Sequence, residues 1–201
     1  MEGKLFVLHS EKVDHKAFEI FEALDYDNSE SADFFKEKSA ELVASQLVNL
    51  RDKRLGNEGR TLLHNAARKG SLAAVLSLIR QGHAIEPVDS CVSKITPLMD
   101  AIINRHIEIS VVLIEAGAHL FRLDINGENG LHYAARGGSC RLLRSIISAS
   151  KLSKEDCIRL ASSKNVKRQY PEDLAANSMI KEILRGLREN GHHGKLFQKS
   201  K

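Results

Sequence analysis

The feature that most limits the possible folds of this chain is a pattern that recurs along it. The stretch ENGLHYAARGGSCRLLRSII, at residues 128–147, has counterparts in GRTLLHNAARKGSLAAVLSLIRQGHAI at residues 59–85 and in KITPLMDAIINRHIEISVVLIEAGAHL at residues 94–120. A weaker copy, QYPEDLAANSMIKEILRGL, occupies residues 169–187. Repetition of one unit at a nearly fixed period predicts an elongated stack in which each copy packs against its neighbours.

The spacing of the copies is close to 33 residues until the last interval. The same position in each copy is held by Thr61, Thr96, Asn129 and Tyr170. The offsets between these positions are 35, 33 and 41 residues, so about eight additional residues precede the last copy. Within that longer interval, Ser153 followed by Asp156 has the spacing of a capping box. We therefore expect a short additional helix at about residues 154–161.

Each copy has the pattern of two antiparallel helices. Thr61 is a suitable N-cap whose hydroxyl can accept a backbone N–H, and Pro97 suits a first helical turn. Gly70 and Gly138 suit the sharp turn between the two helices, where a positive φ is favourable mainly for glycine. Apolar residues then recur at helical spacing in the second helix. These residues are Leu72, Val75, Leu76 and Ile79; Ile109, Val112 and Leu113; and Leu142, Leu143, Ile146 and Ile147.

The opening of each copy resembles the Thr-Pro-Leu-His-x-Ala-Ala signature of the ankyrin repeat. It reads TLLHNAA from residue 61, TPLMDAI from residue 96, NGLHYAA from residue 129 and YPEDLAA from residue 170. Repeat two has Met99 and Arg105 where the family has His and Gly. Repeat four has Glu172 in place of an apolar Leu, which a last repeat with a solvated face would tolerate. The resemblance implies an all-α solenoid over residues 56–188, divided at about 56–89, 90–123, 124–164 and 165–188.

The resemblance also gives the recurring histidines a structural role. His64 and His132 occupy one repeat position, and in the family this imidazole joins neighbouring loops through hydrogen bonds. His192 and His193 lie in a polar stretch and are expected to be solvated. The sequence offers no set of ligands at metal-binding spacing, so neither a metal nor another cofactor is expected.

The segments that flank the repeats have different compositions. Residues 1–55 contain two helical patterns and are predicted to form either an N-terminal helical cap on the stack or a separate partner-binding arm. Residues 189–201 are polar and are predicted to be disordered. Residues 1–50 carry 11 acidic and 5 basic residues, whereas the remaining 151 carry 15 acidic and 25 basic residues. The repeats are therefore basic, and an acidic partner or the acidic N-terminal segment would complement them.

Ankyrin stacks bind extended protein segments on a concave face formed by hairpin tips and first helices. The resemblance therefore implies a protein–protein interaction module without catalytic activity. The positions that it places on the exposed concave face are Glu58, Arg60, Asn65, Arg68 and Lys69 in repeat one; Ile95, Asp100, Ile103 and Asn104 in repeat two; and Glu128, Tyr133 and Arg136 in repeat three. Each of these residues is alternatively ordinary solvated surface.

Asp100 is the most distinctive of these positions. We expect its carboxylate to face the groove and to receive a Lys, Arg or His of the partner, with Asn104 one turn further on the same face. The alternative is an ion pair with Arg68 or Arg136. Repeats one and two also resemble the ankyrin stack of the Tonsoku-like replication-repair proteins, which read a histone tail. Asp100 matches their acidic residue, but Ile103 replaces their Asn and Ile95 their Trp.

Three function classes therefore follow from the sequence. The first is a protein-binding module, with a histone-tail reader in a chromatin or repair protein as its narrower alternative. The second is nucleic-acid binding through the basic repeats, which is disfavoured by only 5% aromatic residues and by the lack of a reading motif. The third is an enzyme, for which no catalytic constellation is present. Three cysteines without a Cys-x-x-Cys motif favour a reducing, intracellular compartment, cytoplasmic or nuclear, and we expect a monomer without a membrane span.

Overall fold

The computed structural model describes residues 59–86, 93–149 and 151–189 of the chain. The predicted N-terminal cap or arm and the predicted polar tail lie outside the described residues. The elements in chain order are α3 (Leu62–Lys69), α4 (Leu72–Arg80), α5 (Pro97–Ile103), α6 (Ile107–Glu115), α7 (Gly130–Gly137), α8 (Cys140–Ile147), α9 (Lys154–Ala161), the 3-10 turn η1 (Pro171–Leu174) and α10 (Ser178–Glu189). These described elements include no strand, and the predicted all-α fold is confirmed.

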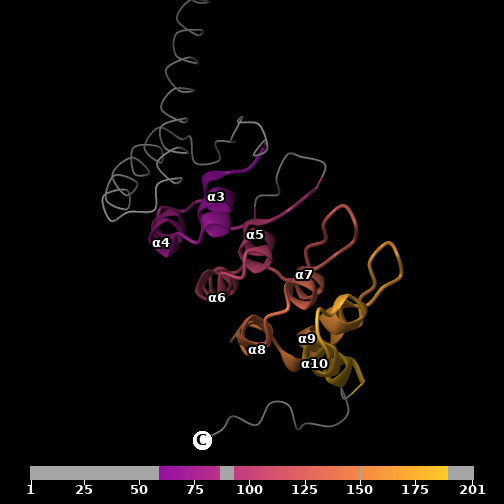
Figure 1. Cartoon of the computed structure of the whole chain (residues 1–201). Coiled ribbons are helices and arrows are strands. Elements are labelled where there is room, and N and C mark those ends of the chain that lie inside the picture. Colours follow the sequence, from indigo (N-terminus) through magenta and orange to yellow (C-terminus); the bar gives the residue numbers. More distant parts are fainter. Residues whose placement is uncertain (1–58, 87–92, 150, 190–201) are drawn as a thin grey trace, which may run out of the picture.

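The helices form two layers, as Figure 1 shows. The first helices of the repeats, α3, α5 and α7, lie side by side in one layer, and η1 extends this layer beyond α7. The second helices, α4, α6 and α8, form the other layer, in which α4 contacts α6 and α6 contacts α8. Each helix pair therefore buries its apolar faces against the next pair, as expected for a repeat stack.

Small residues allow the first helices to approach closely. The alanine pair of α3, Ala66 and Ala67, and the pair of α7, Ala134 and Ala135, are fully buried. Gly130 begins α7 against Leu120, and a Cβ at Gly130 would lie 2.1 Å from the Leu120 Cδ2 atom. A larger residue at this position would therefore require the buried Leu120 side chain to shift. The leucines between the layers supply the apolar area, and each fully buried one stabilises the fold by about 1.5–3 kcal/mol.

The turns between the paired helices follow the glycine prediction in repeats one and three. Gly70 and Gly138 have φ values of +85° and +74°. Arg105 occupies the same position in repeat two with a φ of +62°, a conformation that disfavours a residue with a side chain. The ring of His106 covers Gly70, and its Nε2 atom lies 3.0 Å from the Arg68 carbonyl oxygen. This contact ties the end of α3 to the start of α6.

The last repeat and the segment before it depart from the regular pattern. The predicted additional helix is confirmed as α9. The Ser153 hydroxyl accepts the Asp156 N–H at 3.0 Å, and the Asp156 carboxylate accepts the Ser153 N–H at 3.3 Å, which confirms the capping box. The first helix of repeat four is only the 3-10 turn η1. The expected solvated Glu172 is wrong, because its side chain is 7% exposed and accepts a hydrogen bond from Arg188 at 2.7 Å.

Candidate partner-binding surface

The recurring histidines lie inside the stack and not on its surface. His64 and His132 are fully buried. The Nδ1 atom of His64 accepts the Thr61 N–H at 3.1 Å, so Nε2 carries the ring hydrogen and donates to the Ile95 carbonyl at 3.0 Å. The predicted structural role is confirmed. Thr61 and His64 form a capping box at the start of α3, and the Thr61 hydroxyl also lies 2.9 Å from the His64 Nδ1 atom.

His132 makes the equivalent link between repeats three and four. Its Nδ1 atom accepts the Asn129 N–H at 3.2 Å, and its Nε2 atom lies 3.3 Å from the Gln169 carbonyl oxygen. Burial lowers the pKa of His132, with smaller opposing contributions from that hydrogen bond and from the charge of Glu128. The ring is therefore held neutral, as this donor–acceptor arrangement requires.

The loops that precede α7 and η1 project on the same side of the stack (Figure 1), and residues 93–95, which precede α5, lie beside the first of them. The Ile125 N–H donates to the Ser93 carbonyl at 3.0 Å, and the Val166 N–H donates to the Asn126 carbonyl at 2.9 Å. These backbone hydrogen bonds join the loop before α7 to residue 93 on one side and to the loop before η1 on the other. The hairpins and the exposed side of α5 and α7 therefore form one continuous surface, which we call the hairpin surface.

Asp100 does not present an open carboxylate to this surface. Its side chain is 3% exposed, and its Oδ2 atom accepts a hydrogen bond from the Arg60 Nε atom at 3.1 Å. The prediction that it faces the groove as a receptor is wrong, and its ion-pair partner is Arg60 rather than Arg68 or Arg136. Arg60 precedes the first helix of repeat one and reaches the middle of α5. Asn104 contributes differently from the prediction, because its side-chain amide donates to the Asp100 backbone carbonyl at 2.8 Å.

Glu128 is likewise an internal connector. Its side chain is 6% exposed, and its Oε1 atom accepts hydrogen bonds from Arg136 at 2.6 Å and from Asn165 at 3.3 Å. The hydrogen bond to Glu128 is the main cause that raises the pKa of Arg136. The pair links α7 to the last hairpin, and the predicted exposure of Glu128 is wrong.

Tyr133 also has an internal partner. Its hydroxyl donates to the Asp124 Oδ2 atom at 2.8 Å, and burial followed by this hydrogen bond raises its pKa. The Asp124 Oδ1 atom accepts the backbone N–H groups of Asn126 at 2.8 Å and Glu128 at 2.7 Å. Asp124 thus holds the hairpin in its turn, and the polar end of Tyr133 completes that arrangement.

The other predicted site residues divide by their exposure. Asn65 and Ile95 are 2% and 7% exposed, so the prediction that they lie on the surface is wrong. Arg60, Arg68 and Tyr133 are half-buried. The predicted residues that the structure leaves accessible are Lys69, Ile103, Asn104 and Arg136. Glu58 lies outside the described residues.

The sequence reasoning missed three exposed apolar residues in the hairpins. Leu123 and Ile125 expose 53% and 48% of their surface, and Val166 exposes 66%. Their sequence signal was the presence of large apolar residues inside turn-rich segments, where solvated loops usually carry polar ones. Ile103, at the end of α5, is 42% exposed and adds a fourth apolar residue. Apolar area at this surface therefore lies mainly in the hairpins.

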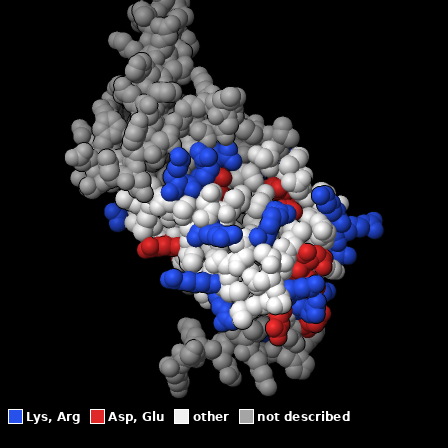
Figure 2. All heavy atoms as spheres, in the orientation of Figure 1, with Lys and Arg blue, Asp and Glu red and all other residues white. Residues whose placement is uncertain are grey.

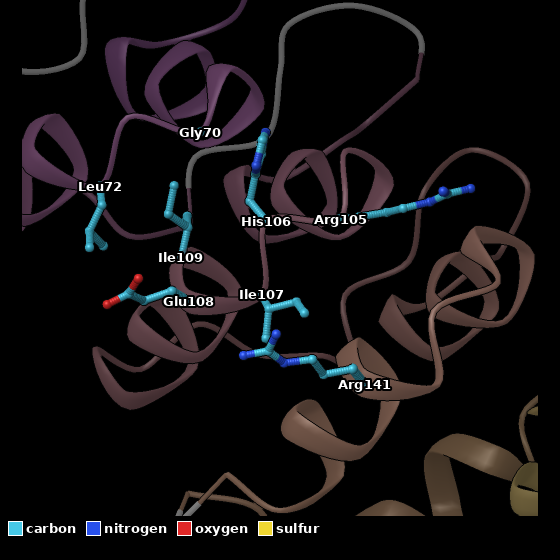
Figure 3. Close-up of a pocket in the computed structure, with 8 residues that line it drawn as sticks. All are labelled: Gly70, Leu72, Arg105, His106, Ile107, Glu108, Ile109 and Arg141. Carbon is cyan, nitrogen blue, oxygen red and sulfur yellow. The ribbon is translucent and has the colours of Figure 1, made fainter.

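Charge and cavities complete the description. Lys and Arg cover more of the described surface than Asp and Glu in the view of Figure 2. A cavity of about 540 Å³ lies between the α3–α4 turn, the α5–α6 turn and Arg141 of α8 (Figure 3). None of its lining residues was predicted as a site residue.

The described residues contain no group of three His, Cys, Asp or Glu side chains arranged to hold a metal ion. They also contain no helix with the length and apolarity needed to cross a membrane.

Stacked helix pairs joined by hairpins define a helical repeat protein. The family model described as ankyrin repeats (3 copies) matches residues 35–124 and 63–157, which together span more than half of the chain. The chain belongs to the ankyrin-repeat family, whose fold serves protein–protein interaction. It is 30% identical over 129 residues to the B-cell lymphoma 3 protein homolog of Mus musculus, and this alignment covers 64% of the chain and 27% of that protein. The first family match begins inside the segment predicted as a cap or arm.

Proposed function

We propose that this chain is a non-catalytic, intracellular module that binds an extended segment of a partner protein on the hairpin surface. The observation that carries the proposal is the row of exposed apolar residues on that surface. Ile103, Leu123, Ile125 and Val166 expose between 42% and 66% of their area. Burial of apolar area is the main favourable contribution to most protein association, at about 25 cal/mol per Å².

The rigidity of the hairpins supports this role. Backbone hydrogen bonds join neighbouring hairpins, and the Asp124 carboxylate fixes the turn of one of them. A surface that is already ordered loses little conformational entropy when a ligand binds. Three side chains of types that are common in catalysis have structural partners here, since His64 and His132 join neighbouring repeats and Asp100 is paired with Arg60.

The test is selection of binding peptides from a random library of displayed 12-residue sequences, with the full chain as the target. The affinity of the selected peptides is then measured for the Ile103→Glu and Ile125→Glu variants. We expect at least tenfold weaker binding, because each change places a charge in a contact between apolar groups. Met179→Glu is the matched control, since Met179 is 54% exposed on α10 and lies outside the hairpin surface. Equal affinity for all three variants would place binding elsewhere.

A further inference from the structure

We infer that the hairpin surface selects an acidic segment that also carries apolar side chains. This inference rests on the proposed function and names the chemistry of the partner. It starts from one repeat position, two residues before each N-cap. That position is held by Gly59, Lys94, Gly127 and Arg168, whose φ values are +82°, +55°, +70° and +60°.

The position has a left-handed backbone in all four repeats, but only two of them have glycine there. A side chain in this conformation costs folding free energy, which glycine avoids. In repeats two and four the side chain is a Lys and an Arg, and both are exposed. Strained residues that persist on a surface point toward a use for their side chains. Lys94 and Arg168 can serve such a use by placing a positive charge on the hairpin surface.

The two cations flank the apolar residues described above. Ser93, next to Lys94, accepts the Ile125 N–H at 3.0 Å. Val166, two residues before Arg168, donates its N–H to Asn126 at 2.9 Å, and a Cβ at Gly127 would lie 3.5 Å from the Val166 Cγ1 atom. The order across the surface is therefore cation, apolar residues, cation.

The described hairpin residues, 93–95, 119–128 and 162–170, expose no carboxylate to balance these cations. Their acidic residues are Asp124 and Glu128, which are 6% and 5% exposed and hold internal hydrogen bonds. Arg122 pairs with Glu86 at 3.0 Å. This leaves four exposed cations for which the described residues provide no ion pair: Lys94, Lys164, Lys167 and Arg168. Of these, Lys164 lies over the Tyr170 ring, with its Nζ atom 4.7 Å from the ring centroid. An unbalanced charge of one sign attracts a ligand of the other sign.

The geometry sets the spacing that the ligand needs. Lys94 and Arg168 hold the same position two repeats apart, and packed helices are separated by about 8–10 Å, so the two positions lie roughly 16–20 Å apart. An extended chain advances by about 3.3–3.6 Å per residue. The acidic residues of the ligand are therefore expected about five or six positions apart, with apolar residues between them.

The apolar content of the surface favours a protein ligand over a nucleic acid. Single-stranded nucleic acids bind basic grooves through aromatic side chains on which bases stack. The exposed large residues between the cations are aliphatic: Leu123, Ile125 and Val166. Aliphatic side chains bury the Leu, Ile or Phe of a peptide but offer little to a phosphate backbone.

The test uses the full chain and the double variant Lys94→Gly/Arg168→Gly. This variant removes both charges and both strained side chains, so it keeps the fold and raises the melting temperature. Arg105→Gly is the matched control, since Arg105 is a cation with a φ of +62° that lies in the α5–α6 turn beside the cavity and outside the hairpins. We expect peptides selected on the wild type to be enriched in Asp and Glu. They should bind the double variant about tenfold more weakly and the Arg105→Gly variant with unchanged affinity.

Three results would overturn the inference. The first is selected peptides without acidic enrichment, or no selected peptides at all. The second is equal affinity for the wild type and the double variant; if Ile125→Glu still abolishes binding, the proposed function survives and only the acidic partner is wrong. The third is a 12-nucleotide single-stranded DNA that competes with the selected peptides and binds more tightly, which would assign the surface to nucleic acid. A synthetic peptide of residues 1–50 that competes in the same way would support the inference and identify the chain's own acidic segment as the ligand.

Discussion

Repeats one and three differ from repeats two and four in how they hold their backbones. The odd repeats have His64 and His132 at the fourth position of the repeat opening, where each ring joins its own N-cap to the next hairpin. The even repeats have Met99 and Asp173 there. Asp173 keeps half of the histidine's role, because its Oδ2 atom accepts the Tyr170 N–H at 2.8 Å. The described residues place no hairpin after η1, and Asp173 makes only the contact with its own N-cap.

The second difference concerns positive φ. The three residues other than glycine with positive φ among the described residues are Lys94, Arg105 and Arg168, and all belong to the even repeats. The equivalent residues of the odd repeats that are described are glycines. The odd repeats therefore contribute unstrained backbone and linking hydrogen bonds, while the even repeats place cations at strained positions. The odd repeats therefore contribute mainly to stability, and the even repeats contribute mainly to surface charge.

The largest effect is expected when an odd repeat is given the even residue. His132→Met leaves the buried Asn129 N–H without its acceptor. It also removes one of the two hydrogen bonds to the Gln169 carbonyl, which keeps the Asn165 N–H at 3.0 Å. A buried polar group without a partner costs about 1–3 kcal/mol, so we expect a loss of about 3 kcal/mol in the free energy of unfolding. Urea denaturation followed by circular dichroism measures it.

The control is Met99→Leu, at the equivalent position of even repeat two. Met99 is 2% exposed and has no linking hydrogen bond to lose. A swap of similar volume there should cost less than about 1.5 kcal/mol. If both variants lose the same free energy, the histidine link is not what distinguishes the odd repeats.

The second effect concerns the turn between paired helices. Gly70→Ala places a Cβ 2.6 Å from the His106 Cε1 atom and gives a side chain to a residue with a φ of +85°. The left-handed conformation alone costs about 1–2 kcal/mol, and with the contact we expect about 2 kcal/mol in all. Gly138→Ala is the control, because its nearest neighbour is the Ala176 Cβ atom at 3.3 Å. Thermal denaturation should rank Gly70→Ala as the more damaging change.

These two predictions use features that the sequence made visible. The repeat offsets, the paired helices, the glycine turns and the capping box of α9 are all local patterns, and each recurs or follows a known spacing. The links of His64 and His132 followed from the family position alone. Local chemistry therefore predicted the fold, including the additional helix at residues 154–161.

The candidate surface was less predictable because it depends on contacts between repeats. Asp100 was assigned to the groove from the position that it fills in the repeat, but the Arg60 side chain that pairs with it is 40 residues earlier in the sequence. Helical periodicity gives the face on which a side chain lies and not the ion pair that covers it. Val166 was missed for a related reason, since a hairpin has no periodicity to separate exposed from buried apolar residues.

The third effect is a pH dependence that should belong to the odd repeats. Burial lowers the pKa of His132, so the folded state keeps the ring neutral while the unfolded state binds a proton near pH 6.5. The unfolded state then binds more protons as the pH falls, and the free energy of unfolding decreases between about pH 7 and pH 5. We therefore expect the wild type to lose stability progressively as the pH falls through this range.

The measurement compares wild type with His132→Met at pH 7.5, 6 and 5. The free-energy difference between the two proteins should shrink as the pH falls, because only the wild type loses the contribution of a neutral His132. Charges near the ring act in both directions, since Glu128 and Asp124 favour protonation and Arg136 opposes it. A constant difference across the range would show that these charges cancel the effect of burial.

The smallest effect has the opposite sign and makes an even repeat resemble an odd one. Arg105→Gly gives repeat two the glycine that Gly70 and Gly138 provide elsewhere, and it relieves a φ of +62°. Part of this gain is offset because glycine is more flexible in the unfolded chain. We expect a net stabilisation of about 0.5–1 kcal/mol, or an increase of roughly 1–3 °C in melting temperature. Arg105→Ala separates the causes, since it removes the charge and keeps the strained backbone. If Arg105→Ala stabilises as much as Arg105→Gly, the even repeats are limited by charge repulsion and not by backbone strain.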